Sequence, residues 1–323
     1  MRERTPDRSG AIDLVRIIAV GAIVAGHVWT REVTADWLYT WHVPVFFVLS
    51  GYLWRPERSP RTELVRRTRS LAYPYVTWLV ILTVVLLLVQ GPGPDTRQQI
   101  AGGLAGGGIA GMPYITLWFV GALFFSTLLF RMLQSLPPAV TWVVGVLGAA
   151  AGWLWGPALA DTPLGTGFAV TCLVYLLVGD GLRRLRDRIP AAPLIGLLLV
   201  GSSAVLIVTG LSAPLDIKQG DYGTPVLSLL VSSGISVGLI LLVESVVRPG
   251  GFSRLCTFLA LPLLVVVLAH PVFLWLPWPP WPTFAAAVLV PLVVGLVAIR
   301  TPAAQWITGQ RRMPRHPSAS VAE

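Results

Sequence analysis

Residues 11–29 read AIDLVRIIAVGAIVAGHVW, and this stretch decides the fold. A helix that crosses a hydrocarbon core about 30 Å thick needs about 20 mostly apolar residues, which is close to the length of this run. The run also contains Asp13, Arg16 and His27, which fall on one face of a helix, with about 16 Å of axial rise between Arg16 and His27. Ionisable side chains are costly in a bilayer, so this face predicts a functional site on a membrane-spanning helix.

The composition of the 323-residue chain extends this prediction to the whole protein. Apolar residues make up 54% of the chain, charged residues 12%, and the mean hydropathy is +0.73. These values exclude an ordinary water-soluble domain and predict an all-α, polytopic integral membrane bundle of about ten transmembrane helices, a multi-pass protein of the cell membrane. The expected spans are 11–29, 37–54, 71–90, 113–131, 138–155, 167–183, 191–210, 223–247, 255–276 and 283–300. The Gly-rich stretch 101–111 fits either a re-entrant piece or an outer loop.

The basic residues indicate how these spans are oriented. The formal net charge is +9, and a cytoplasmic N-terminus leaves most of the 24 basic residues on the cytoplasmic side of ten spans. Only Arg31, Arg97 and Lys218 fall outside, and Arg16 falls within a span. This asymmetry follows the positive-inside rule, so we expect both termini in the cytoplasm. The charge therefore requires no nucleic-acid partner.

We expect one transmembrane domain over residues 1–300 and a disordered cytoplasmic tail over 301–323, which ends in a polar, Pro/Ser-rich segment. The first span contains charged residues and no small-residue cleavage site follows it, so we do not expect it to be a signal peptide. Cys172 and Cys256 are far apart in sequence and lack a CxxC motif. They predict neither a disulfide framework nor a metal site.

Two further histidines fall at a depth similar to that of His27. In the expected topology, His42 and His270 both lie in the outer half of the membrane. If the three share a cavity, a neutral imidazole can act as a general base on a hydroxyl while a second imidazole orients it. Coincidence in depth is the less favoured alternative, and a membrane histidine can also simply link helices.

Other polar residues have structural explanations as well. Asp13 and Arg16 could merely pair with each other at the inner interface. Ser50 precedes Gly51, where small residues favour close helix packing over a nucleophilic serine, since no G-x-S-x-G motif is present. Trp118 could stack on a sugar, although membrane tryptophans more often anchor spans at the interface.

Five segments of the chain resemble acyltransferase family 3, particularly its branch similar to fucose O-acetylases. The order and spacing match across most of the chain, and the most specific pieces are the D-x-x-R followed by His in the first span and the H-x-P-x-F-F-x-x-S-G-Y of the second. The matching segments are RSGAIDLVRIIAVGAIVAGH (8–27), WHVPVFFVLSGYL (41–53), RRTRSLAYPY (66–75), LWFVGALFF (117–125) and LAHPVFL (268–274).

The resemblance implies a membrane enzyme that transfers an acyl group, often acetyl from acetyl-CoA, to a hydroxyl of a carbohydrate or glycoconjugate. His27 matches the family's essential histidine, Arg16 its essential arginine and Asp13 the accompanying acid. Arg66 and Arg69 match its cytoplasmic R-x-x-R. The sequence departs from the commoner form at Val15-Arg16-Ile17 and at Val43, where Met is frequent. The donor is expected to be a substrate, acetyl-CoA or another acyl-CoA, rather than a bound cofactor.

These assignments give a hypothesis for the chemistry. Neutral His27 either takes the acceptor proton or carries the acyl group itself, with His42, Ser50, Trp118 and His270 as supporting or substrate-binding residues. Arg66 and Arg69 are expected to bind the phosphates of CoA, although any cytoplasmic loop is rich in arginine. The alternatives are a transporter or flippase of a glycoconjugate and a sensor without catalysis. We find no internal repeat that supports transport.

Overall fold

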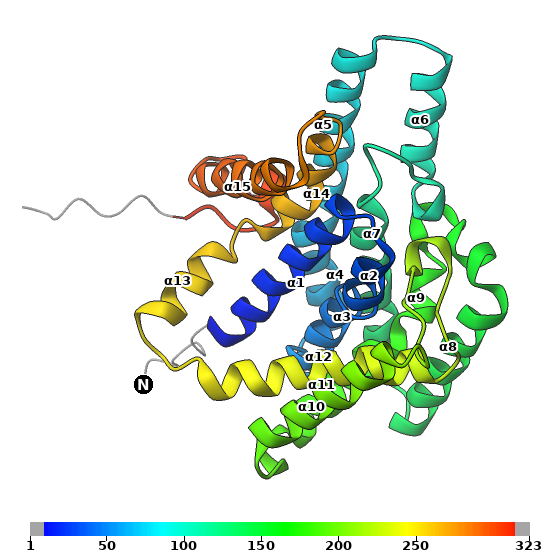
Figure 1. Cartoon of the computed structure of the whole chain (residues 1–323), viewed down its shortest axis with the longest axis vertical. Coiled ribbons are helices and arrows are strands. Elements are labelled where there is room, and N and C mark those ends of the chain that lie inside the picture. The colour runs from blue at the N-terminus through cyan, green and yellow to red at the C-terminus, as the bar shows by residue number, and fades with distance from the viewer. Residues whose placement is uncertain (1–9, 314–323) are drawn as a thin grey trace, which may run out of the picture.

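The computed structural model describes residues 10–313, and this part of the chain is helical (Figure 1). It contains no strand apart from one isolated bridge between Asp216 and Asp221. The α-helices are α1 (Gly10–Val28), α2 (Glu32–Thr34), α3 (Pro44–Tyr52), α4 (Pro60–Arg67), α5 (Tyr73–Gln90), α6 (Pro94–Ala105), α7 (Leu117–Leu133), α8 (Pro138–Ala160), α9 (Phe168–Thr171), α10 (Leu173–Leu185), α11 (Ala192–Val208), α12 (Leu227–Val246), α13 (Gly251–Leu259), α14 (Leu263–Phe273), α15 (Pro280–Ala298) and α16 (Ala304–Thr308).

The helices agree with the positions of the expected spans, and each expected interval contains one helix or two consecutive ones. Within residues 10–313, five helices are long and apolar enough to cross a membrane: α1, the helix over Pro60–Gln90, α8, α12 and α15. The number is seven if each of two bent helix pairs forms one span. The all-helical membrane fold is therefore confirmed, whereas the count of ten and the cytoplasmic termini stay predictions.

The two bent pairs replace spans that the sequence suggested to be continuous. α9 and α10 meet at 49°, and α13 and α14 meet at 53°. Pro262 stands at the second break and has no backbone N–H to continue the hydrogen-bond ladder, which accounts for the bend. The bend leaves His270 on the short helix α14 rather than on one long span.

Helix α6 was not expected from the sequence. It packs against α5 to form a hairpin that extends from the bundle at the top of Figure 1. Pro94 at its first turn suits a helix start, and Gly106 ends it with a φ of +70°. The Gly-rich stretch thus belongs partly to α6 and partly to the short turn over Gly107–Ile109.

The segment after residue 300 is more ordered than expected. α16 packs on the start of α5, where Trp306 stacks on Tyr73 with ring centroids 4.1 Å apart. Trp78 also donates a hydrogen bond to the carbonyl of Ile307 at 3.0 Å. The expectation of disorder from residue 301 is wrong for this helix, because its aromatic and aliphatic side chains have a surface to cover. The rest of the expected tail, from residue 314, lies outside the described residues.

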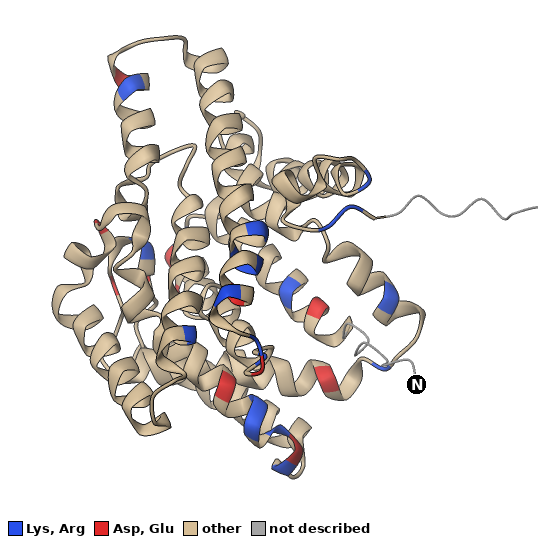
Figure 2. Ribbon diagram, turned by 180° about the vertical axis from the view of Figure 1, so that it is seen from behind, with Lys and Arg blue, Asp and Glu red and all other residues tan. Residues whose placement is uncertain are grey.

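Glycines set the closest helix crossing, between α3 and α10. A Cβ at Gly51 would collide with the carbonyl of Leu176, and one at Gly179 would collide with that of Val48. The close packing suggested for the Ser50-Gly51 pair is therefore present at Gly51. Figure 2 shows basic residues gathered along α4 and toward the end of α10, while α5 carries no charge.

Candidate active site

A cavity of about 130 Å³ lies at the C-terminal end of α1. Segments remote in sequence meet around it: α1, the turns before α3, the start of α7, the loop before α12, and α14. We call it the histidine cavity. Trp118 forms an aromatic part of its wall, and the polar residues that line it are His27, Tyr39, His42, Thr116, Asp216, Lys218 and Gln219. The cavity thus contains His27, His42 and Trp118 of the residues that the sequence suggested.

His270 stands directly behind His27. The Nε2 atom of His270 lies 3.2 Å from Nδ1 of His27, and the ring centroids are 5.1 Å apart. His270 is fully buried. His270 lies on α14, the helix that follows the bend after α13. His27 and His270, which are separated by most of the chain, thus form one pair.

The three histidines share a hydrogen-bond pattern that assigns their tautomers. The Nδ1 atoms of His27, His42 and His270 lie 3.0, 2.5 and 3.2 Å from the carbonyl oxygen four residues earlier. A carbonyl only accepts, so Nδ1 carries the proton in each neutral ring and Nε2 keeps its lone pair. The His27 Nδ1–H points to both Ile23 O and His270 Nε2, which leaves Nε2 of His27 as the basic nitrogen.

Aromatic packing connects His42 to the pair. The Tyr39 ring centroid is 5.0 Å from His42 and 6.4 Å from His27, and its hydroxyl donates to the carbonyl of Gly26 at 3.3 Å. No hydrogen bond between His42 and the other two histidines occurs in residues 10–313. His42 therefore shapes the cavity wall, whereas His270 contacts His27 directly.

Sequence reasoning missed Lys218 and Thr116. Lys218 Nζ donates to the carbonyl of Gly108 at 2.9 Å and lies on a loop outside the predicted spans. Burial lowers the pKa of Lys218, and the nearby Asp216 and Asp161 carboxylates partly offset this. A signal was present: the chain has 23 arginines and one lysine, and that lysine is in an outer loop of the expected topology.

Asp13 and Arg16 lie toward the other end of α1. Arg16 Nη1 donates to Asp13 Oδ1 at 2.8 Å, with Asp13 buried and the Arg16 side chain 29% exposed. Neither residue lines the histidine cavity, and Ser50 does not line it either. Asp13 and Arg16 thus form a local ion pair, and neither residue is part of the lining of the histidine cavity.

Arg66 and Arg69 share an open hollow of about 650 Å³. This arginine hollow is lined by Arg61, Thr62, Val65, Arg66, Arg69, Ser70, Gln305, Gly309, Gln310 and Arg311. Arg66 pairs with Glu63 at 3.6 Å and its side chain remains 50% exposed. Arg61 belongs to the basic stretch 55–69, which the sequence suggested as the phosphate-binding loop, but it was not singled out there. Arg311 was missed because it belongs to the segment expected to be disordered.

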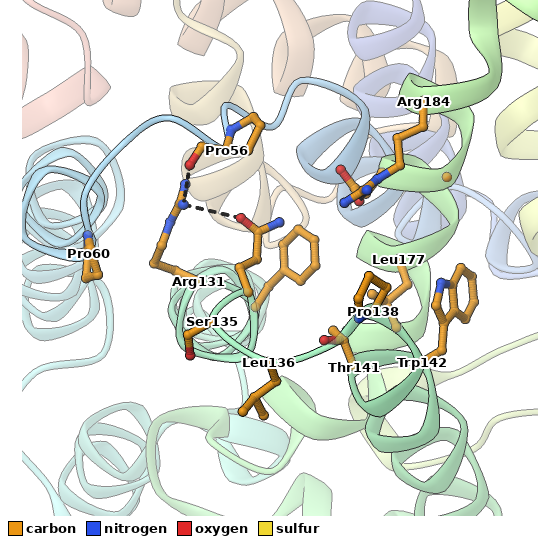
Figure 3. A pocket seen from close by; sticks show the side chains of 14 residues that line it. Pro56, Pro60, Arg131, Ser135, Leu136, Pro138, Thr141, Trp142, Leu177 and Arg184 are labelled. Carbon is orange, nitrogen blue, oxygen red and sulfur yellow. Dashed lines mark hydrogen bonds and ion pairs between the residues drawn. The ribbon is translucent and has the colours of Figure 1, made fainter.

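Figure 3 shows another basic hollow, whose two arginines, Arg131 and Arg184, hydrogen-bond to other groups of the protein. Arg131 donates to the carbonyls of Pro56 and Arg55 at 3.1 and 2.8 Å. Arg184 donates to Asp180 at 2.7 Å. These contacts hold α7 to the loop after α3 and brace α10. The hollow of Figure 3 contains two arginines, whereas the arginine hollow brings together four, Arg61, Arg66, Arg69 and Arg311, and so offers more positive charge to an anion.

Helix α15 separates the arginine hollow from the histidine cavity. Trp29, two residues after His27, packs edge-on against Trp281 at the start of α15, with ring centroids 4.7 Å apart. The axial rise of α15 over Pro280–Ala298 is about 28 Å. α16 and the arginine hollow follow its other end.

Comparison with known proteins identifies the family. A family model for an acyltransferase domain, that of acyltransferase family 3, matches residues 9–300. No curated protein and no solved structure matches the chain. The described residues contain no group of three or more His, Cys, Asp or Glu placed to hold a metal ion.

Proposed function

Because the chain belongs to acyltransferase family 3, we propose that this membrane acyltransferase is an O-acyltransferase of the cell envelope that moves an acyl group, most simply acetyl, from acyl-CoA to a hydroxyl of a carbohydrate or glycoconjugate. The observation that carries the proposal is the 3.2 Å contact between His27 Nδ1 and His270 Nε2 at the cavity wall. It supports a neutral imidazole with a fixed proton on Nδ1 and an available base at Nε2.

The His27 base acts on a hydroxyl, which is a poor nucleophile at neutral pH. As the acceptor oxygen attacks the thioester carbon, Nε2 of His27 takes its proton. His270 Nε2 accepts the Nδ1–H of the imidazolium that forms, in the way that a third group orients the base in other acyl transferases. In the second version, Nε2 of His27 attacks the thioester and passes the acyl group to the hydroxyl.

The arginine hollow supports a cytoplasmic donor. Arg66 and Arg69, both exposed and in one hollow, suit the phosphates of CoA, because guanidinium groups bind phosphate oxygens in pairs. The pantetheine arm then reaches along α1, past Asp13 and Arg16, toward His27. The roles of these two residues in the transfer belong to the proposal.

The test uses purified full-length protein in lipid nanodiscs with acetyl-CoA labelled in the acetyl group. The label should move to an added glycan mixture, with release of one thiol for each acetyl transferred. Mass spectrometry of the cell's glycans with and without the gene then identifies the acceptor by its acetyl difference. A transporter would consume no acetyl-CoA, and that result would overturn the proposal.

The two versions of the mechanism differ in one intermediate. Rapid quenching of the protein with labelled acetyl-CoA in denaturant near neutral pH, where an acyl-imidazole survives longest, should leave label on His27 in the absence of acceptor only if the acyl-histidine version holds. Label in the matching His27→Ala protein would come from another residue and exclude that assignment.

A further inference from the structure

We propose that Lys218 and Thr116 bind the carbonyl oxygen of the acyl group in the histidine cavity and stabilise the negative charge that this oxygen gains during transfer. The inference rests on the proposed function, because it assigns the part of the reaction that His27 does not perform. A base activates the hydroxyl, but acyl transfer also needs donors for the developing oxyanion.

Thr116 provides the first observation. It is 4% exposed and lines the cavity, and its hydroxyl has no hydrogen-bond partner within residues 10–313. A buried hydroxyl without a partner is costly, so a residue that lines the cavity and carries such a hydroxyl points to a bound group that completes it. A hydroxyl can donate to a carbonyl oxygen.

Lys218 provides the second observation, from a different part of the chain. It lines the same cavity, and its ammonium has three donors, of which one is used on the carbonyl of Gly108. That contact holds the side chain in place while leaving further donors for a ligand. The neighbouring carboxylates, Asp216 and Asp161, favour the charged form of this partly buried amine.

The loop that carries Lys218 is fixed by packing. The Asp216 side chain accepts a hydrogen bond from the backbone of Gln219 at 3.3 Å. Gly220 lies so close to Gly156 of α8 that a Cβ on either glycine would collide with the other's backbone. A donor held before the reaction stabilises charge without reorganisation, which is the requirement for an oxyanion site.

Lys218 and Thr116 act while the acceptor oxygen attacks the thioester and the intermediate collapses. The acceptor oxygen forms a bond to the thioester carbon, its proton moves to His27 Nε2, and the carbonyl electrons move onto the oxygen held by Lys218 and Thr116. When the intermediate collapses, the C–S bond breaks, its electron pair leaves on sulfur, and the thiolate takes the proton from His27. If His27 carries the acyl group, its Nε2 attacks the same carbon, the same oxygen gains the charge, and the C–S bond breaks to release the thiolate. The acceptor hydroxyl then attacks the acyl carbon, the C–N bond to Nε2 breaks, and the hydroxyl proton passes through the freed His27 to the thiolate.

Substitutions test the assignment in the full-length protein in nanodiscs. Lys218→Met and Thr116→Val should each lower kcat about 10²-fold or more and leave KM for acetyl-CoA unchanged. Lys218→Arg and Thr116→Ser keep a donor and should recover most of the loss. Arg97→Met removes a positive charge from α6, away from the cavity, and serves as the matched control that keeps the wild-type kcat. The thermal unfolding temperature of each variant excludes loss of folding as the cause.

A chemical test uses the fact that Lys218 is the only lysine of the chain. Acetylation of amines by an N-hydroxysuccinimide ester removes the charge of Lys218 and should inactivate the wild type. Treated Lys218→Arg protein should keep its activity, although its N-terminal amine reacts as in the wild type. Equal inactivation of both proteins would overturn the role of Lys218.

The outcomes separate this inference from the proposed function. If the wild type transfers acetyl and His27→Ala does not, a Lys218→Met protein with normal kcat overturns the inference alone. An effect of Lys218→Met confined to KM for an acidic acceptor also overturns it, because it would make Lys218 a specificity residue. A wild type that consumes no acetyl-CoA overturns both.

Discussion

The histidine cavity and the arginine hollow differ in size and in how far their functional groups are exposed to solvent. The cavity is small, about 130 Å³ against about 650 Å³, and its functional groups are buried or partly buried and held by contacts between remote segments. The hollow is open, and its arginines keep much of their side chains in solvent, 50% for Arg66. A reacting group needs exact orientation, whereas phosphate binding needs mainly charge. Substitutions in the cavity should therefore change kcat, and substitutions in the hollow should change KM.

The largest effect is expected from His27→Ala. Loss of the base or acyl carrier should lower kcat at least about 10²–10⁴-fold, while the protein stays folded and still binds acyl-CoA. Transfer assays with binding measurements on the same preparation check both parts. Near-normal turnover of His27→Ala would show that the histidine cavity is not the site of acyl transfer.

His270→Leu is expected to have the next largest effect. His270 acts through His27, so its loss should lower kcat about 10–100-fold, as loss of an orienting partner does at other sites, with KM for acyl-CoA unchanged. His270→Gln offers an oxygen that can accept the His27 proton and should recover part of the rate. If Gln and Leu are equally damaging, His270 only fills space.

The double substitution Arg66→Ala, Arg69→Ala should raise KM for acyl-CoA about 10-fold and leave kcat at saturation nearly unchanged. Arg184→Ala is the matched control, because that side chain is 55% exposed and pairs with Asp180 instead of lining the hollow. Unchanged binding of labelled acetyl-CoA in the double variant would argue against the hollow as the donor site.

The smallest effect is expected from salt. Raising the ionic strength from 0.01 to 0.1 M shortens the screening length from about 30 Å to about 10 Å, which weakens attraction to exposed arginines. KM for acyl-CoA should rise a few-fold while kcat, set in the histidine cavity, stays constant. A salt-dependent kcat would contradict the assignment of donor binding to the hollow and of the chemical step to the cavity.

The sequence predicted the helical membrane fold because apolar runs of spanning length have few alternatives. It could not predict α6, whose composition is only weakly apolar, or the bend that separates α13 from α14. The bend depends on how Pro262 is accommodated by neighbouring helices, which is a tertiary property. The number of spans stays a prediction for the same reason: helix lengths in the structure differ from hydropathy windows.

The candidate site was partly predictable. Histidines in apolar runs are conspicuous, so His27, His42 and His270 could be found, and the structure brings them to one cavity region. Lys218 and Thr116 could not be placed, because loops fold back according to packing and a threonine near a span end is common. Whether Asp13, Arg16 and Ser50 take part in the reaction stays a prediction.

The separation of the two sites by the length of α15 has an electrical consequence. Under the proposed mechanism, the acceptor gives up a proton on the far side, and that proton returns with the CoA thiol to the side of the donor. The acetyl group moves the opposite way without charge. No net charge crosses the membrane in a turnover, so a transmembrane voltage should neither drive nor oppose the transfer.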